Sequence, residues 1–96
     1  MTGEHQSSES TYAALTDETR VRILLTLADQ YDEAWSSKWP TFSELREQVD
    51  VEDTSRFSYH LSELQDDFVQ KVDGRYHPRI AALEVVAAIR AGSYTP

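Results

Sequence analysis

Residues 53–77 read DTSRFSYHLSELQDDFVQKVDGRYH, a segment with two different periodicities in succession. Its first half has the period of an amphipathic helix, with one apolar side made by Phe57, Leu61 and Leu64. Its second half changes period and contains Asp73-Gly74, a dipeptide that strongly indicates a tight hairpin turn. The stretch therefore predicts a helix over about residues 53–65, followed directly by a β-hairpin over about residues 69–77.

The segment before this stretch predicts a second short helix, over residues 42–49. Thr41 is followed three residues later by Glu44, which fits a capping box at the helix start. Residues 50–52 break the helix, and Asp53 is suited to cap the next one. Two short helices joined by three or four residues are typical of a helix-turn-helix.

A central helix buried on more than one side is expected further upstream, beginning at Thr16 or Asp17. Its apolar residues recur at helical spacing: Val21, Leu24, Leu25, Ala28 and Tyr31. Arg20 lies near the start of this helix and is expected to pair with an acid. A short helix over residues 12–15 is expected before it, and the polar residues 1–10 predict a disordered acidic tail.

Pro78 is expected to open the last helix, because a proline costs little at the first helical position. Gly92 marks its expected end. The helix is apolar on nearly every side, and five of its residues are candidates for a dimer interface: Ile80, Leu83, Val86, Ala87 and Ile89. Because a small domain cannot cover a terminal helix all round, we expect a homodimer. The alternative is that the small alanines leave an exposed face that needs no partner.

The expected order is helix, helix, short edge strand over residues 38–41, helix, turn, helix, hairpin and helix. This is a mainly α fold with a small β-hairpin (α+β), in the layout of a winged helix-turn-helix. Ninety-six residues make one domain, which we assign to residues 11–96 together with its C-terminal dimerisation helix.

The outward side of the helix over residues 53–65 carries candidate DNA-binding residues: Ser55, Arg56, Ser58, Tyr59 and Ser62. Small hydroxyls let a helix approach the major groove closely and can bond to phosphates or base edges. In the hairpin, Lys71 and Arg75 are expected to lie along the phosphate backbone, where they position the protein. The alternative for both sets is a solvated surface. His60 falls beside the apolar stripe and is expected to pack at the edge of the core.

The charge distribution is unusual for a protein that binds DNA. The net charge is −8, and residues 50–67 alone hold six acids and one base. This acidic segment flanks the expected DNA-binding helix and would repel phosphates at low salt, whereas residues 68–96 carry four bases and two acids. In molar salt the Debye length is about 3 Å, so this repulsion nearly vanishes. We therefore expect a DNA affinity that depends weakly, or even inversely, on salt concentration.

Four segments of the chain resemble those of one family of regulators. ALTDETRVRIL (residues 14–24), TFSEL (41–45) and FSYHLSEL (57–64) are similar to the opening, the first helix-turn-helix segment and the recognition helix of ArsR-like winged helix regulators. AAIRAGSY (87–94) is similar to haloarchaeal members. The resemblance covers about residues 11–95. It implies a DNA-binding transcriptional repressor of a halophilic archaeon, dimeric and cytoplasmic, with the candidate residues of the recognition helix facing double-stranded DNA.

Several function classes are not supported by the sequence. The chain has no cysteine, the last helix offers only Glu84 as a metal ligand, and its three histidines share no ligand spacing, so no metal or cofactor is expected. No phosphate-binding loop or nucleophile motif occurs, so we do not expect an enzyme. The apolar runs are too short to span a membrane. The alternative to DNA binding is a winged-helix module that binds another protein.

Overall fold

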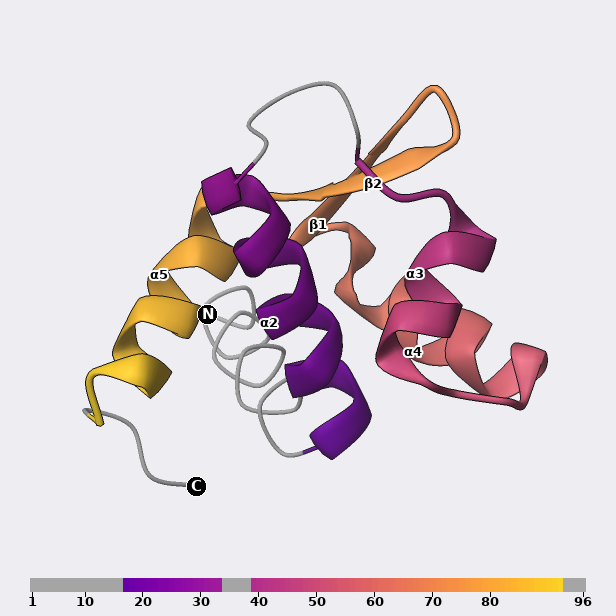
Figure 1. Ribbon diagram of the computed structural model, residues 1–96, viewed down its shortest axis with the longest axis horizontal. Coiled ribbons are helices and arrows are strands. Elements are labelled where there is room, and N and C mark those ends of the chain that lie inside the picture. Colours follow the sequence, from indigo (N-terminus) through magenta and orange to yellow (C-terminus); the bar gives the residue numbers. More distant parts are fainter. Residues whose placement is uncertain (1–16, 34–38, 93–96) are drawn as a thin grey trace, which may run out of the picture.

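The computed structural model describes residues 17–33 and 39–92, which form four helices and a two-stranded antiparallel sheet (Figure 1). The elements are α2 (Glu18–Glu33), α3 (Phe42–Val49), α4 (Thr54–Gln65), β1 (Val69–Val72), β2 (Arg75–Pro78) and α5 (Ile80–Arg90). The prediction of a mainly α fold with a small β-hairpin is confirmed. The expected tail over residues 1–10 and helix over 12–15 lie outside the described residues. None of the described helices is long and apolar enough to cross a membrane.

The predicted boundaries of α3 and the start of α4 are confirmed by local hydrogen bonds. The Thr41 hydroxyl accepts from the Glu44 N–H, and the Glu44 carboxylate accepts from the Thr41 N–H, which completes the capping box. Asp50 ends α3 in the left-handed conformation at φ 67°, and its N–H bonds to the Arg46 carbonyl. The Asp53 carboxylate then caps α4 through the Arg56 N–H, at 3.1 Å.

Helix α2 is the central element of the fold, with α5 on one side and α3 and α4 on the other (Figure 1). Side chains from every helix and from β1 fill the core between them. The largest that are fully buried are Ile23, Leu24, Leu27, Leu45, Phe57, Leu61, Leu64, Val69 and Val86. Tyr31, which the sequence placed in the apolar stripe of α2, is 44% exposed and stacks on Trp39 near the end of the helix.

The hairpin follows α4 directly, as predicted. Asp73 and Gly74 both have positive φ, at 54° and 76°, which is the geometry of a two-residue turn whose twist matches that of the strands. Of the edge strand expected over residues 38–41, the described residues form a single bridge, between Thr41 and Arg75. The Tyr76 N–H also bonds to the Pro40 carbonyl at 2.9 Å, so β2 is fixed to the chain just before α3.

The prediction that Pro78 opens the last helix is wrong. Pro78 is buried, closes β2 and pairs with Val69, and α5 begins only at Ile80. The reason is a tertiary hydrogen bond, because the Arg79 N–H donates to the Phe68 carbonyl at 2.9 Å and keeps the chain extended for one more residue. Gly92, at φ 75°, follows the end of α5 as predicted.

Candidate nucleic-acid interface

Helix α4 has one buried side and one exposed side. Phe57, His60, Leu61 and Leu64 are buried against the rest of the domain. The five candidate DNA-binding residues of this helix are all exposed: Ser55, Arg56, Ser58, Tyr59 and Ser62. The structure therefore gathers them on one surface of one helix, which we call the α4 face. Tyr59 is its largest member and is 56% exposed.

The polar side chains of the α4 face make few hydrogen bonds or ion pairs with the described residues. Ser62 donates its hydroxyl proton to the Tyr59 carbonyl at 3.0 Å, so it retains acceptor lone pairs for a ligand. Within the described part of the chain, the Arg56 guanidinium makes no ion pair or side-chain hydrogen bond, and neither do the hydroxyls of Ser55 and Ser58. The face thus offers hydroxyls and one guanidinium to an incoming partner.

Beneath the α4 face lies a polar cluster that joins α4 to the start of α2. Arg20 is 9% exposed and its Nε donates to Nδ1 of His60 at 3.0 Å. His60 is 5% exposed, and its Nε2 lies 3.8 Å from Oδ2 of Asp17. The Arg20 guanidinium also lies over the Tyr59 ring, 5.4 Å from its centroid. The expectation that Arg20 pairs with an acid is therefore corrected, because its side-chain hydrogen bond goes to an imidazole.

Asp17 is the ionised member of this cluster. Partial burial by itself would raise the pKa of its carboxyl, but three favourable interactions outweigh that effect. These are hydrogen bonds from the backbone N–H groups of Thr19 and Arg20, and the positive charge of the nearby Arg20 guanidinium. The net result is a pKa for Asp17 below its ordinary value, so this carboxylate stays charged at neutral pH.

Sequence reasoning placed Arg20 and His60 separately and missed their contact. A signal was present, because Arg20 stands four residues before Leu24 and His60 stands three residues after Phe57, on the buried sides of their helices. A charged or polar residue at a core position of each helix indicates a buried pair, since an unpaired one would be costly. The partners are 40 residues apart, so the pairing itself follows only from the packing of α2 against α4.

The two basic residues of the hairpin differ in how far their charges are already engaged by other groups of the protein. Lys71 is exposed, and its ammonium lies 5.5 Å from the centroid of the Tyr76 ring. Arg75 is already engaged, because its Nη1 donates to the Trp39 carbonyl at 2.6 Å and lies 3.8 Å from the Glu44 carboxylate. Arg75 therefore holds the hairpin to the chain before α3, whereas Lys71 makes no ion pair with the described residues and keeps its ammonium exposed beside the Tyr76 ring.

Acidic side chains border the α4 face. Six of them, all exposed, come from the turn before α4, from α4 itself and from the residues just after it: Asp50, Glu52, Asp53, Glu63, Asp66 and Asp67. A phosphate that approached Arg56 would also meet the field of these carboxylates. The face is thus nearly uncharged at its centre and negative around it.

The five candidate dimer residues on α5 do not form one exposed set. Ile80 is 73% exposed, Ala87 is exposed, and Leu83 and Ile89 are half-buried. Val86 is only 2% exposed and belongs to the core, so its assignment to an interface is wrong. The cause is the contact between α5 and α2, which takes up the side of α5 that carries Val86.

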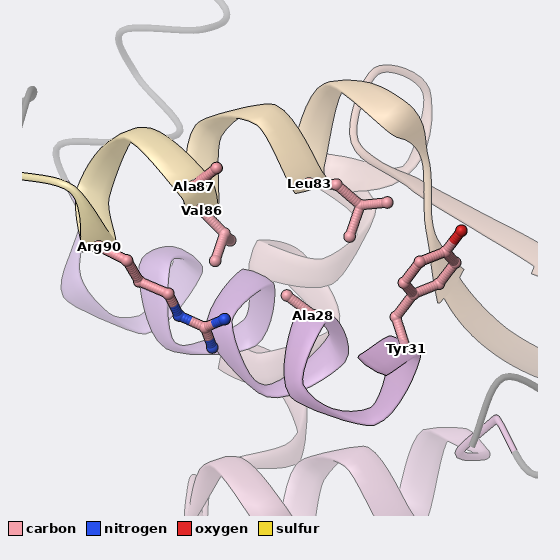
Figure 2. Close-up of a pocket in the computed structure, with 6 residues that line it drawn as sticks. All are labelled: Ala28, Tyr31, Leu83, Val86, Ala87 and Arg90. Atoms are coloured by element: carbon pink, nitrogen blue, oxygen red, sulfur yellow. The ribbon is translucent and has the colours of Figure 1, made fainter. Parts of the chain in front are cut away.

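A shallow apolar groove of about 260 Å³ separates the exposed edges of α2 and α5. Figure 2 shows Leu83, Val86 and Arg90 reaching from α5 toward α2, where Ala28 and Tyr31 line the other wall. Arg90 forms an ion pair with Asp29 of α2 across one end of the groove. Elsewhere, in residues 17–33 and 39–92, no three potential metal-ligating side chains lie close enough together to hold an ion.

Comparison with protein families places most of the chain in one of them. The model of a family described as a domain of unknown function, DUF7347, matches residues 8–89. No curated protein and no solved structure matches the chain.

Proposed function

We propose that this chain, which belongs to the DUF7347 family, is a winged helix-turn-helix transcriptional regulator that binds double-stranded DNA through the α4 face. In this proposal α3 and α4 form the helix-turn-helix, α4 enters the major groove and the hairpin is the wing. The resemblance to ArsR-like regulators further implies that the protein acts as a repressor in the cytoplasm.

One observation carries the proposal. The α4 face is exposed along the helix and bears three serines, a tyrosine and an arginine, with most of their polar groups free of partners in the described structure. An ordinary solvated helix surface would be filled with pairs of glutamate and lysine, which stabilise a helix without binding anything. Short hydroxyl side chains allow the close approach that base-edge contacts require.

The hairpin and α5 supply secondary support. Lys71 lies on a strand that follows α4 directly, where a wing could contact the sugar–phosphate backbone. Ile80 leaves a large apolar side chain exposed on α5, which suits a homodimer. A two-fold dimer would place two copies of α4 against half-sites about one DNA turn, roughly 34 Å, apart.

The second candidate function is a winged-helix module that binds a protein. The observation in its favour is the set of six exposed carboxylates on α4 and on the residues just before and after it, which would attract a basic protein surface and repel DNA at low salt. The two functions differ in what the α4 face contacts, so the same variants distinguish them.

The test is selection of bound duplexes from a random DNA pool at molar potassium chloride, followed by fluorescence anisotropy on the enriched sequence. We expect one enriched motif, and we expect Ser58→Glu to abolish binding because it sets a negative charge at the centre of the α4 face. Gln48→Glu adds the same charge at an exposed site beside Gln30 of α2 and is expected to bind normally. Failure to enrich any motif would favour the protein-binding function.

A further inference from the structure

We propose that Arg20 is a positioning residue for the α4 face, and that it fixes the Tyr59 ring in place while His60 fixes Arg20. This inference rests on the proposed DNA-binding function and adds to it a residue outside the helix-turn-helix. Arg20 belongs to α2 and is 9% exposed, so it would act on DNA only through the tyrosine that it supports.

The three side chains form a continuous series of contacts from the core to the surface. His60 is buried, the Arg20 Nε bonds to its Nδ1 at 3.0 Å, and the Arg20 guanidinium lies 5.4 Å from the Tyr59 ring centroid. The rings of Tyr59 and His60 are themselves 5.3 Å apart. Tyr59 is the outermost member and the only one of the three that is exposed. A partner that touches the tyrosine therefore meets a ring supported from behind by two buried side chains.

The hydrogen bond from Arg20 requires one tautomer of the His60 imidazole. Arginine is always a donor, so Nδ1 must accept and cannot carry a proton. The proton of the neutral imidazole is then on Nε2, the atom that faces the Asp17 carboxylate at 3.8 Å. Asp17 thus favours the tautomer that Arg20 requires, and Asp17, Arg20 and His60 act as one unit.

Only arginine can make both contacts at once. Its Nε donates in the plane of the guanidinium while the face of the same group stacks on an aromatic ring. A lysine in this place could form one point contact but could not also cover the ring. A ring held in one orientation before binding loses less conformational freedom when it meets DNA, which for one immobilised side chain corresponds to about a three- to tenfold gain in affinity.

The test is a double-mutant cycle on affinity for the enriched duplex, at a temperature where all variants are folded. We expect Arg20→Lys to weaken binding about three- to tenfold in the wild-type background, and to have no further effect in a Tyr59→Ala background. Arg22→Lys is the matched control, because Arg22 lies two residues along α2 and bonds to the Val49 carbonyl instead. Equal losses from Arg20→Lys in both backgrounds would overturn the inference.

A second measurement does not depend on DNA. The ¹⁵N shifts of the His60 imidazole at neutral pH are expected to show an unprotonated Nδ1 and a protonated Nε2, and a proton on Nδ1 would overturn the inference.

If Arg20→Lys does not fold, His60→Asn and His60→Leu replace it in the cycle. Asparagine keeps an acceptor near the position of Nδ1, so it is expected to retain more of the coupling to Tyr59 than leucine. Equal coupling in the two variants would count against the inference.

The proposed DNA binding and the proposed role of Arg20 are tested by different outcomes. If the wild-type protein binds no DNA at any salt concentration, the proposed function fails and the role of Arg20 fails with it. If the wild type binds DNA and the cycle shows no coupling between Arg20 and Tyr59, the DNA-binding function stands and only the positioning role is lost.

Discussion

Asp17, at the start of α2, makes the stability of the folded protein depend on pH. Its pKa is lower in the folded protein than in the unfolded chain, so the folded state binds fewer protons and the resulting stabilisation is present above about pH 4. This stabilisation disappears as the pH falls through the folded-state pKa. We expect Asp17→Asn, which keeps an acceptor for the Thr19 N–H, to be less stable than wild type at pH 7 and to approach it in acid. Urea unfolding followed by circular dichroism at several pH values measures the difference, and a difference independent of pH would contradict the assignment.

Arg56 is the only basic residue of the α4 face, and its removal tests how that face binds. Arg56→Ala is expected to weaken binding to the enriched duplex by about ten- to hundredfold if the guanidinium reads a guanine, with relaxed preference at one base pair. Arg79→Ala removes the same charge from an exposed site at the start of α5 and is expected to change the affinity less than about twofold. Anisotropy titrations measure both, and equal losses in the two variants would contradict a specific role for Arg56.

The positions of single residues on the α4 face could be predicted from the sequence, whereas the contacts that hold neighbouring side chains in place could not. Helical periodicity alone separates Ser58 and Tyr59 from the buried Phe57, because the spacing of the apolar residues defines the inward side. The Arg20–His60 contact depends on the packing of two helices far apart in the sequence. The engagement of Arg75 with the Trp39 carbonyl is equally non-local, so a residue expected on DNA proved to be committed elsewhere.

At the scale of elements, the start of α3 depends on its capping box. Thr41→Ala removes the hydroxyl that accepts from the Glu44 N–H and is expected to lower the free energy of unfolding by about 1 kcal/mol. Thr41→Ser keeps the hydroxyl and is expected to retain most of the stability. Urea unfolding of the three proteins measures the effect. A loss in Thr41→Ser as large as in Thr41→Ala would contradict the stabilising role of the capping hydroxyl.

The hairpin depends on a glycine at its turn. Gly74 has φ 76° and no neighbouring atom within 4 Å of the position that a Cβ would occupy, so an added methyl group meets backbone strain alone. We expect Gly74→Ala to destabilise the hairpin by about 1 kcal/mol, and Gly74→Asn to cost less because asparagine tolerates this conformation. Thermal unfolding of both variants measures the losses, and similar losses for alanine and asparagine would contradict this explanation.

Element boundaries were predictable wherever local chemistry sets them. The caps at Thr41 and Asp53 and the turn at Asp73-Gly74 are determined by residues within three positions, and each was located from the sequence. The start of α5 was misplaced because Pro78 pairs with Val69 and Arg79 bonds to Phe68, contacts that local propensity does not include.

In the whole molecule, substitutions on α5 can separate effects on dimerisation from effects on folding stability. Ile80 is 73% exposed in the single chain, whereas Val86 is in the core. Ile80→Asp is therefore expected to convert the proposed homodimer into a monomer with little loss of stability, because no buried contact within the single chain is removed. Val86→Ala is expected to lower the free energy of unfolding by about 2 kcal/mol and to leave the dimer intact. Light scattering at high salt and urea unfolding measure the two effects, and a wild-type monomer at micromolar concentration would contradict the homodimer.

The acidic body and the nearly uncharged α4 face together predict an unusual response to salt. The slope of DNA affinity against salt concentration reports the number of phosphates neutralised by cations. On the proposed surface the cations available for this purpose are Arg56 and Lys71, since Arg75 is engaged, and six carboxylates stand beside them. Salt screens the repulsion from those carboxylates as well as the attraction of the two cations, so the opposing effects nearly cancel.

DNA binding by the α4 face is therefore best tested by the affinity for the enriched duplex, measured by anisotropy from tens of millimolar to molar potassium chloride. Binding through the hydroxyl-rich face of α4 predicts an affinity that is nearly constant, or that rises, across this range. No binding at any concentration, or a steep loss of affinity with salt, would contradict it, because a steep loss is the mark of a surface that binds DNA mainly through paired cations and phosphates.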